Sequence, residues 1–481
     1  MRRPAYSEAG CLFRSETIAG ILAGGSGAFA LQAVTAKKEW RGGAHLFALV
    51  LLSIAVGAVV GGVGASFRLA LDWAADRRVL LLEWAQGTPI WGVVVVVGAI
   101  ALAAAIAAWL VQWFSPDSAG SGIPHVESVL QHDVPIAPWH LIPVKFVGGV
   151  LAIGSGFALG REGPSVQIGA TLGHEIGRRL GWGRMDCRSL LAAGAGAGLA
   201  TAFNAPIGGS VFVLEELVRR FDTRITIVTF GASTGAIVVA RLMLGSAPEF
   251  AVPGVVEPSL LVMPAFLLLG LVMGAIGVIY NKAILGMLDA ADSVKRVPRW
   301  AKAAAIGAAI GLLAFFWPVA VGGGDVLTRD ALHWSGSGTT VAALGALFLI
   351  RMVLSPLSYA AQTPGGLFAP LLAVGALAGV LCAPGWNAMC GHVAPGAEVD
   401  PAAMGIVAMV GLFTAVVRAP LTGIVLVSEM TVGTTLLLPM IGVCIGSMLM
   451  PTVMGNEPIY ESLKLRAVRI AGERERDDRR S

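Results

Sequence analysis

The sequence predicts an all-α polytopic membrane protein built as an inverted repeat, because of its apolar composition, its long apolar stretches and the motifs that recur in both halves. Of 481 residues, 56% are hydrophobic and 13% are charged, whereas a globular domain carries about 25% charged residues. This composition excludes a soluble multi-domain enzyme. The net charge of +4 gives no indication of a nucleic-acid partner.

Apolar stretches follow one another along almost the whole chain. All are predicted to be helices, because open sheets cannot exist in lipid and the alternating pattern of a membrane barrel is absent. Crossing a bilayer takes about 20 residues, so the shorter or interrupted stretches are expected to be broken or re-entrant helices. The stretches cover approximately 17–34, 45–67, 91–114, 141–160, 189–214, 225–244, 259–280, 303–321, 341–363, 366–383, 402–417 and 419–454.

Three glycine-containing segments end in a proline directly before an apolar run. They read Gly-Ser-Gly-Ile-Pro at 120–124, Gly-Arg-Glu-Gly-Pro at 160–164 and Gly-Leu-Phe-Ala-Pro at 366–370. Proline is favoured in the first turn of a helix, and glycine lets the backbone approach a ligand closely. Each segment therefore predicts a helix that starts within the membrane.

Two motifs occur once in each half, in the same order. Gly-x3-Pro-x4-Gly-x3-Gly begins at Gly160 and again at Gly366. Ala-Pro-x2-Gly-x5-Glu ends at Glu215 and again at Glu429. The recurrence predicts a duplicated membrane unit.

The basic residues predict how the two halves are oriented. The loop between the two motifs is arginine-rich in the first half, at 178–188, and lacks lysine and arginine in the second, at 385–401. By the positive-inside rule, these equivalent loops lie on opposite faces, so the repeat is inverted and both termini are cytoplasmic. Arg77 and Arg78 do not fit this scheme, because one span after a cytoplasmic start should place them outside.

The predicted organisation has four parts. A cytoplasmic N-terminal segment with a short helix covers 1–44, and the first membrane repeat covers 45–245. The second, inverted repeat covers 246–460, and a short polar cytoplasmic tail covers 461–481. Because no signal peptide is indicated, a cell membrane, and specifically a bacterial inner membrane, is the expected location.

Inverted repeats with broken helices are typical of transporters that bind their substrate near the membrane midplane. The N-terminus of each half-helix offers unpaired N–H groups and about half a positive charge. The three glycine-containing helix starts are therefore expected to converge on one anion.

These three segments, together with Tyr460 near the end of the last helix, resemble the CLC family of chloride channels and proton/chloride antiporters. The similarity covers roughly residues 45–465 and is to prokaryotic-type members without cytoplasmic CBS domains. It implies a homodimer in the lipid bilayer, with one pathway per subunit for chloride and protons, and no cofactor.

The resemblance also implies the chloride site. Hydroxyls and backbone N–H groups suit a permeating anion, because partial charges bind it strongly enough to select it and weakly enough to release it. The hydroxyls of Ser121 and Tyr460 and the backbone N–H groups of 367–368 would bind a central chloride. The backbone N–H groups of 161–163 would bind an outer chloride. The expected chloride-binding residues are Ser121, Leu367, Phe368, Tyr460, Arg161 and Gly163.

Two glutamates are the expected proton carriers. The Glu162 carboxylate lies at an apolar helix start, where it can occupy the outer anion site and, once protonated, swing away. It is therefore the expected gate and outer proton acceptor. Glu216 resembles the internal proton acceptor of the antiporter members, which favours chloride/proton antiport over a passive voltage- or pH-gated chloride channel. An exposed glutamate at a helix end is the simpler alternative for Glu216.

Three further ionisable residues take plainer interpretations. Glu429 is expected to satisfy a helix end rather than carry protons. Lys145 is expected to add positive potential near the anion path, with pairing to a buried carboxylate as the alternative. His125 stands where many family members have an acidic residue, and its titration near neutrality could alter the inner vestibule.

Other functions have less support in the sequence. Ser121 argues against nitrate-preferring members, and Tyr460 with the intact segment 160–164 argues against fluoride exporters. Gly231-Ala-Ser-Thr-Gly235 matches the nucleophile motif of a hydrolase, but it lies in an apolar stretch without the strand and histidine that this chemistry needs. We therefore expect no enzyme activity. No group of histidine, cysteine or aspartate residues has the spacing of metal ligands, so no metal site is expected.

Overall fold

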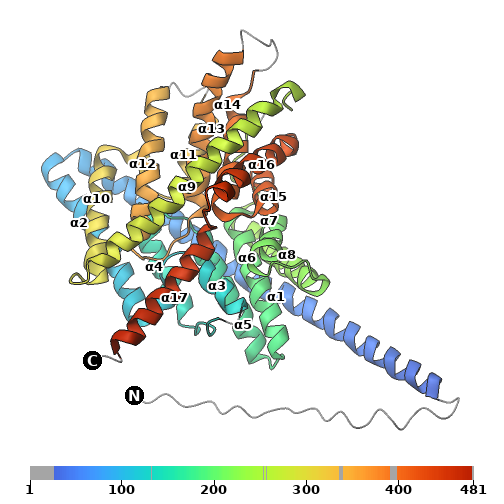
Figure 1. Ribbon diagram of the computed structural model, residues 1–481. Helices are drawn as coiled ribbons and strands as arrows, with labels where there is room; N and C mark the ends of the chain where they lie inside the picture. Colours follow the sequence, from blue (N-terminus) through green and yellow to red (C-terminus); the bar gives the residue numbers. More distant parts are fainter. Residues whose placement is uncertain are drawn as a thin grey trace. The chain divides into compact units, whose positions relative to one another are not determined.

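The computed structural model describes residues 27–131, 133–252, 254–255, 257–334, 340–390 and 398–478. Within these residues the regular structure is helical, with isolated β-bridges beside the helices (Figure 1). The chain divides into two compact units, Met1–Leu49 and Val50–Ser481. Every contact discussed below lies within the second unit.

Seven helices of the described part are long and apolar enough to cross a membrane, which confirms the predicted polytopic all-α class. In the first of these helices, α1, the apolar span covers the 44 residues Gly43–Gln86. The boundary expected at residue 45 therefore falls inside one helix. These helices are α1 (Gly27–Gln86), α2 (Pro89–Phe114), α8 (Thr223–Leu244), α9 (Met263–Ser293), α10 (Arg299–Phe316), α12 (Val341–Ala360) and α13 (Phe368–Cys390).

Shorter helices lie among the long ones (Figure 1). The 8 residues of α3 span about 12 Å, far less than the roughly 30 Å of a bilayer core. Such helices start or stop inside the membrane, as the glycine–proline segments predict. The remaining α-helices, most of them shorter, are α3 (Ile123–Leu130), α4 (Leu141–Gly154), α5 (Glu162–Arg179), α6 (Arg184–Phe203), α7 (Pro206–Phe212), α11 (Asp325–Leu332), α14 (Pro401–Val417), α15 (Pro420–Thr431), α16 (Leu437–Val453) and α17 (Ile459–Asp478).

Short non-α turns connect several of these helices. The chain forms a π-helical turn, η2 (Val213–Leu217), directly after α7. Three 3-10 turns are η1 (Pro116–Ser118), η3 (Leu260–Val262) and η4 (Pro318–Ala320). The described part of the expected polar tail, from residue 461 to residue 478, belongs to α17.

Glycines allow α5 and α6 to cross closely. A β-carbon at Gly169 would lie 2.1 Å from the carbonyl oxygen of Gly194, and one at Gly194 would lie 2.2 Å from that of Gly169. In the second half, a β-carbon at Gly379 would lie 2.3 Å from the Met404 carbonyl oxygen, where α13 crosses α14. Only glycine permits backbones to meet this closely, so the repeated glycines hold equivalent helix pairs in both halves.

The two halves also exchange helix caps. The Glu215 carboxylate accepts hydrogen bonds from the first N–H groups of α15, including that of Thr422 at 2.7 Å. Its repeat counterpart, Glu429, accepts from the first N–H groups of α7, including that of Gly208 at 2.7 Å. A carboxylate is stabilising at a helix N-terminus. This reciprocity is what a two-fold relation between the repeats requires, and it confirms that Glu429 satisfies a helix end.

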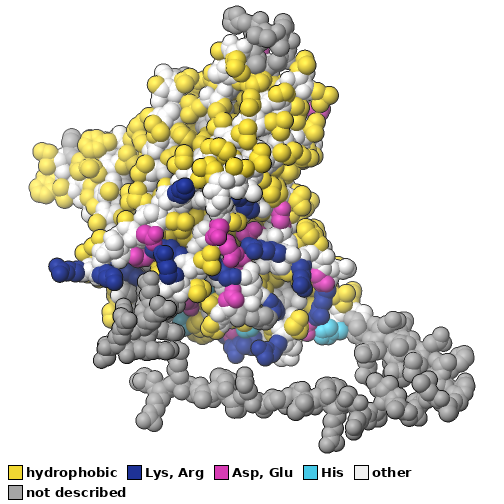
Figure 2. Space-filling view, viewed as in Figure 1, with side chains coloured by type: hydrophobic (Ala, Val, Ile, Leu, Met, Phe, Trp, Pro, Cys, Tyr) yellow, Lys and Arg dark blue, Asp and Glu magenta, His cyan; other side chains and the backbone are white. Residues whose placement is uncertain are grey.

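Charged side chains gather at one end of the membrane helices. Figure 2 shows them around α17 and the neighbouring end of α9, whereas hydrophobic side chains cover much of the rest of this face. Arg466 on α17 pairs with Asp289 at 3.1 Å and Asp292 at 2.5 Å on α9. Lys464 pairs with Asp133 at 2.8 Å. These ion pairs fasten α17 directly after Tyr460.

Candidate functional site

The three glycine-containing segments meet, as the sequence predicts. The Gly120 N–H donates to the Thr363 carbonyl at 3.2 Å, and the Gly365 N–H donates back to Gly120 at 3.0 Å. Gly160 and Gly366 exchange hydrogen bonds of 2.9 and 2.7 Å. Backbone hydrogen bonds therefore join the segments before α3, α5 and α13, which brings the starts of these helices together.

The Glu162 carboxylate lies at the N-terminus of α13. Its side chain is 0% exposed, and Oε1 accepts hydrogen bonds from the N–H groups of Phe368 at 2.5 Å and Ala369 at 3.4 Å. Oε2 is buried without a hydrogen-bond partner. The carboxylate thus makes the contacts that an anion bound to this helix start would make. Ala369 was missed by the sequence analysis, because only a fold shows which N–H groups face the carboxylate.

Glycines line the Glu162 carboxylate on two sides. A β-carbon at Gly160 would lie 2.1 Å from Oε2, and one at Gly366 would lie 2.3 Å from Oε1. Either distance is far inside van der Waals contact. The two repeat-related glycines therefore leave just enough room for this side chain.

Ser121 and Tyr460 bring buried hydroxyls to the same region. Both side chains are fully buried, and neither hydroxyl has a hydrogen-bond partner of normal geometry. The Ser121 Oγ lies 2.6 Å from where a β-carbon at Gly163 would be, and the Tyr460 ring lies 6.0 Å from the Phe368 ring. A buried unpaired hydroxyl costs stability and calls for an explanation. Donation to a bound anion would supply one.

Phenylalanines surround Phe368 and make the wall of the site apolar. Its ring centroid lies 4.8 Å from that of Phe413, 5.7 Å from Phe212 and 6.4 Å from Phe203. These rings come from α14, α7 and α6, so residues far apart in sequence hold the start of α13. Nothing in the sequence distinguishes Phe203, Phe212 or Phe413, because a buried phenylalanine in an apolar helix carries no local signal.

Lys145 lies directly behind the first segment. Its ammonium group is fully buried and donates to the carbonyl oxygens of Ser118 at 3.1 Å and Gly120 at 2.7 Å. Its contacts are thus carbonyls beside Ser121 rather than a carboxylate. This arrangement favours the predicted electrostatic support over the alternative of a buried ion pair.

Glu216 lies in the π-helical turn η2, away from the helix start of α13. It is buried, and Oε1 has no hydrogen-bond partner. Glu127 and Arg219 are its electrostatic neighbours, and they pair with each other at 3.0 Å. Arg219 also reaches Glu461 at 3.5 Å. Burial argues against the alternative of an exposed helix-end glutamate.

Tyr460 is close enough to both predicted proton carriers, Glu162 and Glu216, for their charges to act on its hydroxyl. Glu127 was missed by the sequence analysis, although an acidic residue in the short apolar run after Pro124 is a usable signal. Arg219 and Glu461 have no distinguishing pattern in the sequence, and only their ion pairs in the structure connect them with Glu127 and Glu216.

The Arg161 side chain points away from the anion site. Its guanidinium pairs with Glu249 at 2.8 Å, donates to the Ala202 carbonyl at 2.9 Å, and lies 3.9 Å from Asp325. Only its backbone is therefore available for the predicted outer site. The hydrolase motif at 231–235 lies inside α8, with Ser233 buried, so the strand-turn-helix context is missing there. Among the described residues, no cluster of three metal-ligating side chains is found.

A family comparison decides the identity of this fold. The family profile described as voltage gated chloride channel matches residues 103–451. The chain belongs to the CLC family of voltage gated chloride channels. The match confirms the resemblance that the glycine-containing segments predict.

Several CLC proteins are similar along most of this chain. The H(+)/Cl(-) exchange transporter ClcA of Vibrio parahaemolyticus is 36% identical over 445 residues, which cover 90% of this chain and 93% of the relative. The ClcA of Cronobacter sakazakii is 35% identical, covering 87% of this chain and 90% of the relative. The crystal structure of a slow cyanobacterial Cl-/H+ antiporter is 30% identical, with a TM-score of 0.80, and covers 87% of this chain and 97% of that one.

Proposed function

We propose that this CLC protein exchanges chloride for protons across the membrane. The observation that carries the proposal is the Glu162 carboxylate, which lies buried at the N-terminus of α13 with its Oε1 on the Phe368 N–H. Glu216 is a second buried acidic group. The relatives named H(+)/Cl(-) exchange transporter support the same reaction.

The gate works by competition for one set of donors. An ionised Glu162 carboxylate holds the N–H groups of α13 that a chloride would otherwise take. Protonation removes the negative charge and with it most of the attraction to the helix start. The neutral side chain swings out, a chloride takes its place, and the proton leaves with the side chain toward the outer solution.

Chloride is held by partial charges in this mechanism. The N–H groups of Leu367 and Phe368 and the hydroxyls of Ser121 and Tyr460 donate to a central ion, and the N–H groups of Arg161 and Gly163 donate to an outer one. The apolar wall around Phe368 excludes competing water, so each donor acts more strongly on the anion than it would in bulk solution. Lys145 adds a positive charge behind Ser121.

Glu216 supplies protons from the inner side. Its carboxylate is shielded from bulk water but lies beside Glu127 and Arg219, which connect it with charged residues at one end of the helices. That end is cytoplasmic in this proposal, with both termini on the same side and the protein in a cell membrane. The organisation is that of repeats at 45–245 and 246–460, and the functional unit is a homodimer.

The test is proton movement into liposomes that contain the purified protein, driven only by a chloride gradient. We expect the wild type to move protons against their gradient. Glu162→Ala and Glu216→Gln should still pass chloride but move no protons. Glu83→Gln, which removes an exposed carboxylate on α1, serves as the matched control and should behave as wild type.

Two outcomes would contradict the proposal in different ways. Chloride flux without proton movement in the wild type would make the protein a passive channel. Absence of chloride flux would overturn the choice of ion, and the same assay with nitrate and fluoride would then identify the anion.

A further inference from the structure

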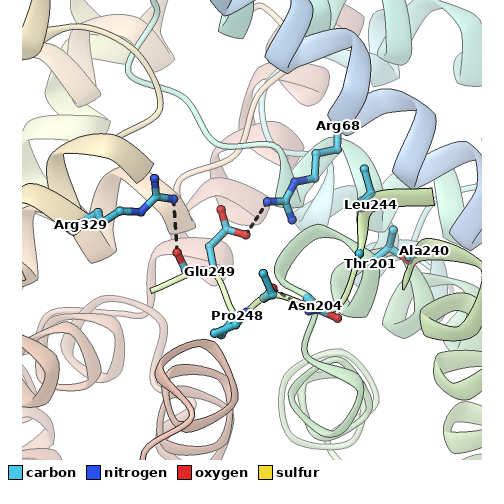
Figure 3. A pocket seen from close by; sticks show the side chains of 10 residues that line it. Arg68, Thr201, Asn204, Ala240, Leu244, Pro248, Glu249 and Arg329 are labelled. Carbon is cyan, nitrogen blue, oxygen red and sulfur yellow. Dashed lines mark hydrogen bonds and ion pairs between the residues drawn. The ribbon is translucent and has the colours of Figure 1, made fainter. Parts of the chain in front are cut away.

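A cavity of about 170 Å³ is lined in part by Glu249, the ion-pair partner of Arg161, and lies outside the site described above (Figure 3). Five parts of the chain line it: Arg68 comes from α1, Asn204 from the end of α6, Leu244 from α8, Glu249 from the segment after α8, and Arg329 from α11. In Figure 3 the Arg68 and Arg329 side chains reach toward Glu249 from opposite sides. The wall of the cavity is therefore built from charged side chains of separate helices.

The side chains that line the cavity carry an excess of positive charge, whereas the carboxylates of Asp72 and Asp325, which also act on Arg68, lie outside the lining. The Glu249 side chain is 3% exposed, and its two oxygens are each taken by a different guanidinium: Oε2 by Arg68 at 2.9 Å and Oε1 by Arg161 at 2.8 Å. Arg329 contacts the Glu249 backbone carbonyl at 3.4 Å instead. Within the described ranges no carboxylate lies within ion-pair distance of Arg329, so the lining carries two arginines against one glutamate.

The segment that carries Glu249 is fastened on both sides. The Asn204 side chain donates to the Ala247 carbonyl at 3.1 Å, and the Phe250 N–H donates to the Met430 carbonyl at 2.9 Å. These bonds hold the cavity open against collapse of the loop. The Arg68 side chain is partly exposed and the Arg329 side chain is exposed, so both can be reached from solvent.

The size of the cavity selects the class of anion. An engineered cavity of about 150 Å³ accepts benzene, so this one holds a group of several heavy atoms and is far larger than a halide requires. Guanidinium groups present planar pairs of N–H donors that match the oxygens of sulfate, phosphate or a carboxylate. The wall therefore suits a small oxyanion better than chloride.

We propose that this cavity binds a small oxyanion between Arg68 and Arg329, and that its occupancy acts on the gate through Glu249 and Arg161. An oxyanion that engages Arg68 draws it from Glu249, which then pairs with Arg161 alone. Arg161 directly precedes Glu162 and is the last residue before α5 begins. The coupling to the gate rests on the proposed function, whereas the binding does not.

Binding is tested with sulfate on the purified full-length protein in detergent, by calorimetric titration at constant ionic strength with gluconate as the replacement anion. We expect one saturable site in the wild type, and about tenfold weaker binding in Arg329→Gln, equivalent to about 1.4 kcal/mol. Arg220→Gln removes the same charge at an exposed position outside the cavity and should bind as wild type.

Three results would overturn the binding site. These are absence of saturable sulfate binding, equal affinity in Arg329→Gln and wild type, or a chloride titration with the same dependence on Arg329, which would assign the cavity to a halide. Because Arg329 is exposed, its substitution is expected to leave the thermal midpoint within a degree or two of wild type. A folded Arg329→Gln protein is thus available for the comparison.

Coupling is tested by the rate of chloride efflux from liposomes with sulfate added outside. We expect sulfate to change the efflux rate of the wild type at least twofold and to leave Arg329→Gln unchanged. If sulfate binds in detergent but the two efflux rates respond equally, the coupling is wrong and the binding site stands. Because this assay detects chloride alone, failure of proton exchange would contradict the proposed function in a separate measurement.

Discussion

Gly160→Ala is predicted to open the gate while Glu162 itself remains a glutamate. The added β-carbon would lie 2.1 Å from Glu162 Oε2 and 2.3 Å from Oε1, and the nearest atoms it meets all belong to this side chain. Ordinary contact begins at 3.4 Å, so the carboxylate must retreat by about 1.3 Å, the difference between 3.4 and 2.1 Å. Gly160 does not have a positive φ, so alanine introduces no backbone strain.

Oε1, which accepts the hydrogen bond from the Phe368 N–H, must retreat by about 1.1 Å, the difference between 3.4 and 2.3 Å. A 2.5 Å bond lengthened by this much, to about 3.6 Å, exceeds the range of real hydrogen bonds. A hydrogen bond to a charged group contributes about 1.5–3 kcal/mol. The occupancy of the closed position should therefore fall at least about tenfold. Chloride efflux at neutral pH should rise toward the rate of Glu162→Ala, and acidification should accelerate it less than in the wild type.

The assay is chloride efflux from liposomes as a function of pH. Gly98→Ala is the matched control, because a β-carbon there meets no atom within 4 Å. The double variant Gly160→Ala with Glu162→Ala should equal Glu162→Ala alone. A slower efflux in Gly160→Ala with an unchanged pH profile would refute the reasoning, since the carboxylate would then not be the group that is displaced.

Three further outcomes are expected. Tyr460→Phe should weaken chloride binding measured by calorimetry by up to about tenfold; unchanged affinity would remove this hydroxyl from the site. Glu215→Gln and Glu429→Gln should each lower the free energy of unfolding by about 1 kcal/mol while proton coupling survives, and clearly unequal losses would contradict the reciprocal capping. Gly194→Ala should destabilise the protein by about 1–3 kcal/mol in thermal unfolding, whereas Gly98→Ala should not. Equal thermal midpoints for the two variants would show that α5 and α6 can separate without cost.

Arg78 shows how a local rule fails where tertiary contact takes over. The positive-inside rule counts arginines as markers of the cytoplasmic face, and this residue did not fit. In the structure its guanidinium donates to the Gly154 carbonyl at 3.0 Å, at the C-terminal end of α4. A cation is favourable there because the carbonyl groups of the last turn lack partners. The position of Arg78 is therefore explained by its contact with a helix end and does not indicate which side of the membrane it lies on.

The sequence by itself determined the membrane class, the repeat and the three helix starts. These features depend on composition and on spacing within short segments, where proline, glycine and apolar residues act locally. The convergence of the segments before α3, α5 and α13 was also predictable, because the motifs match those of a family whose fold brings such helix starts together.

Only the tertiary structure decided which groups meet. The Glu162 carboxylate contacts N–H groups of Phe368 and Ala369 from the other repeat, and Glu216 shares its surroundings with Glu127 on α3. The Arg161 guanidinium turns to Glu249 instead of the anion site. Hydrogen bonds and ion pairs act over a few ångströms, so partners far apart in the chain are chosen by helix packing and leave no local signal in sequence.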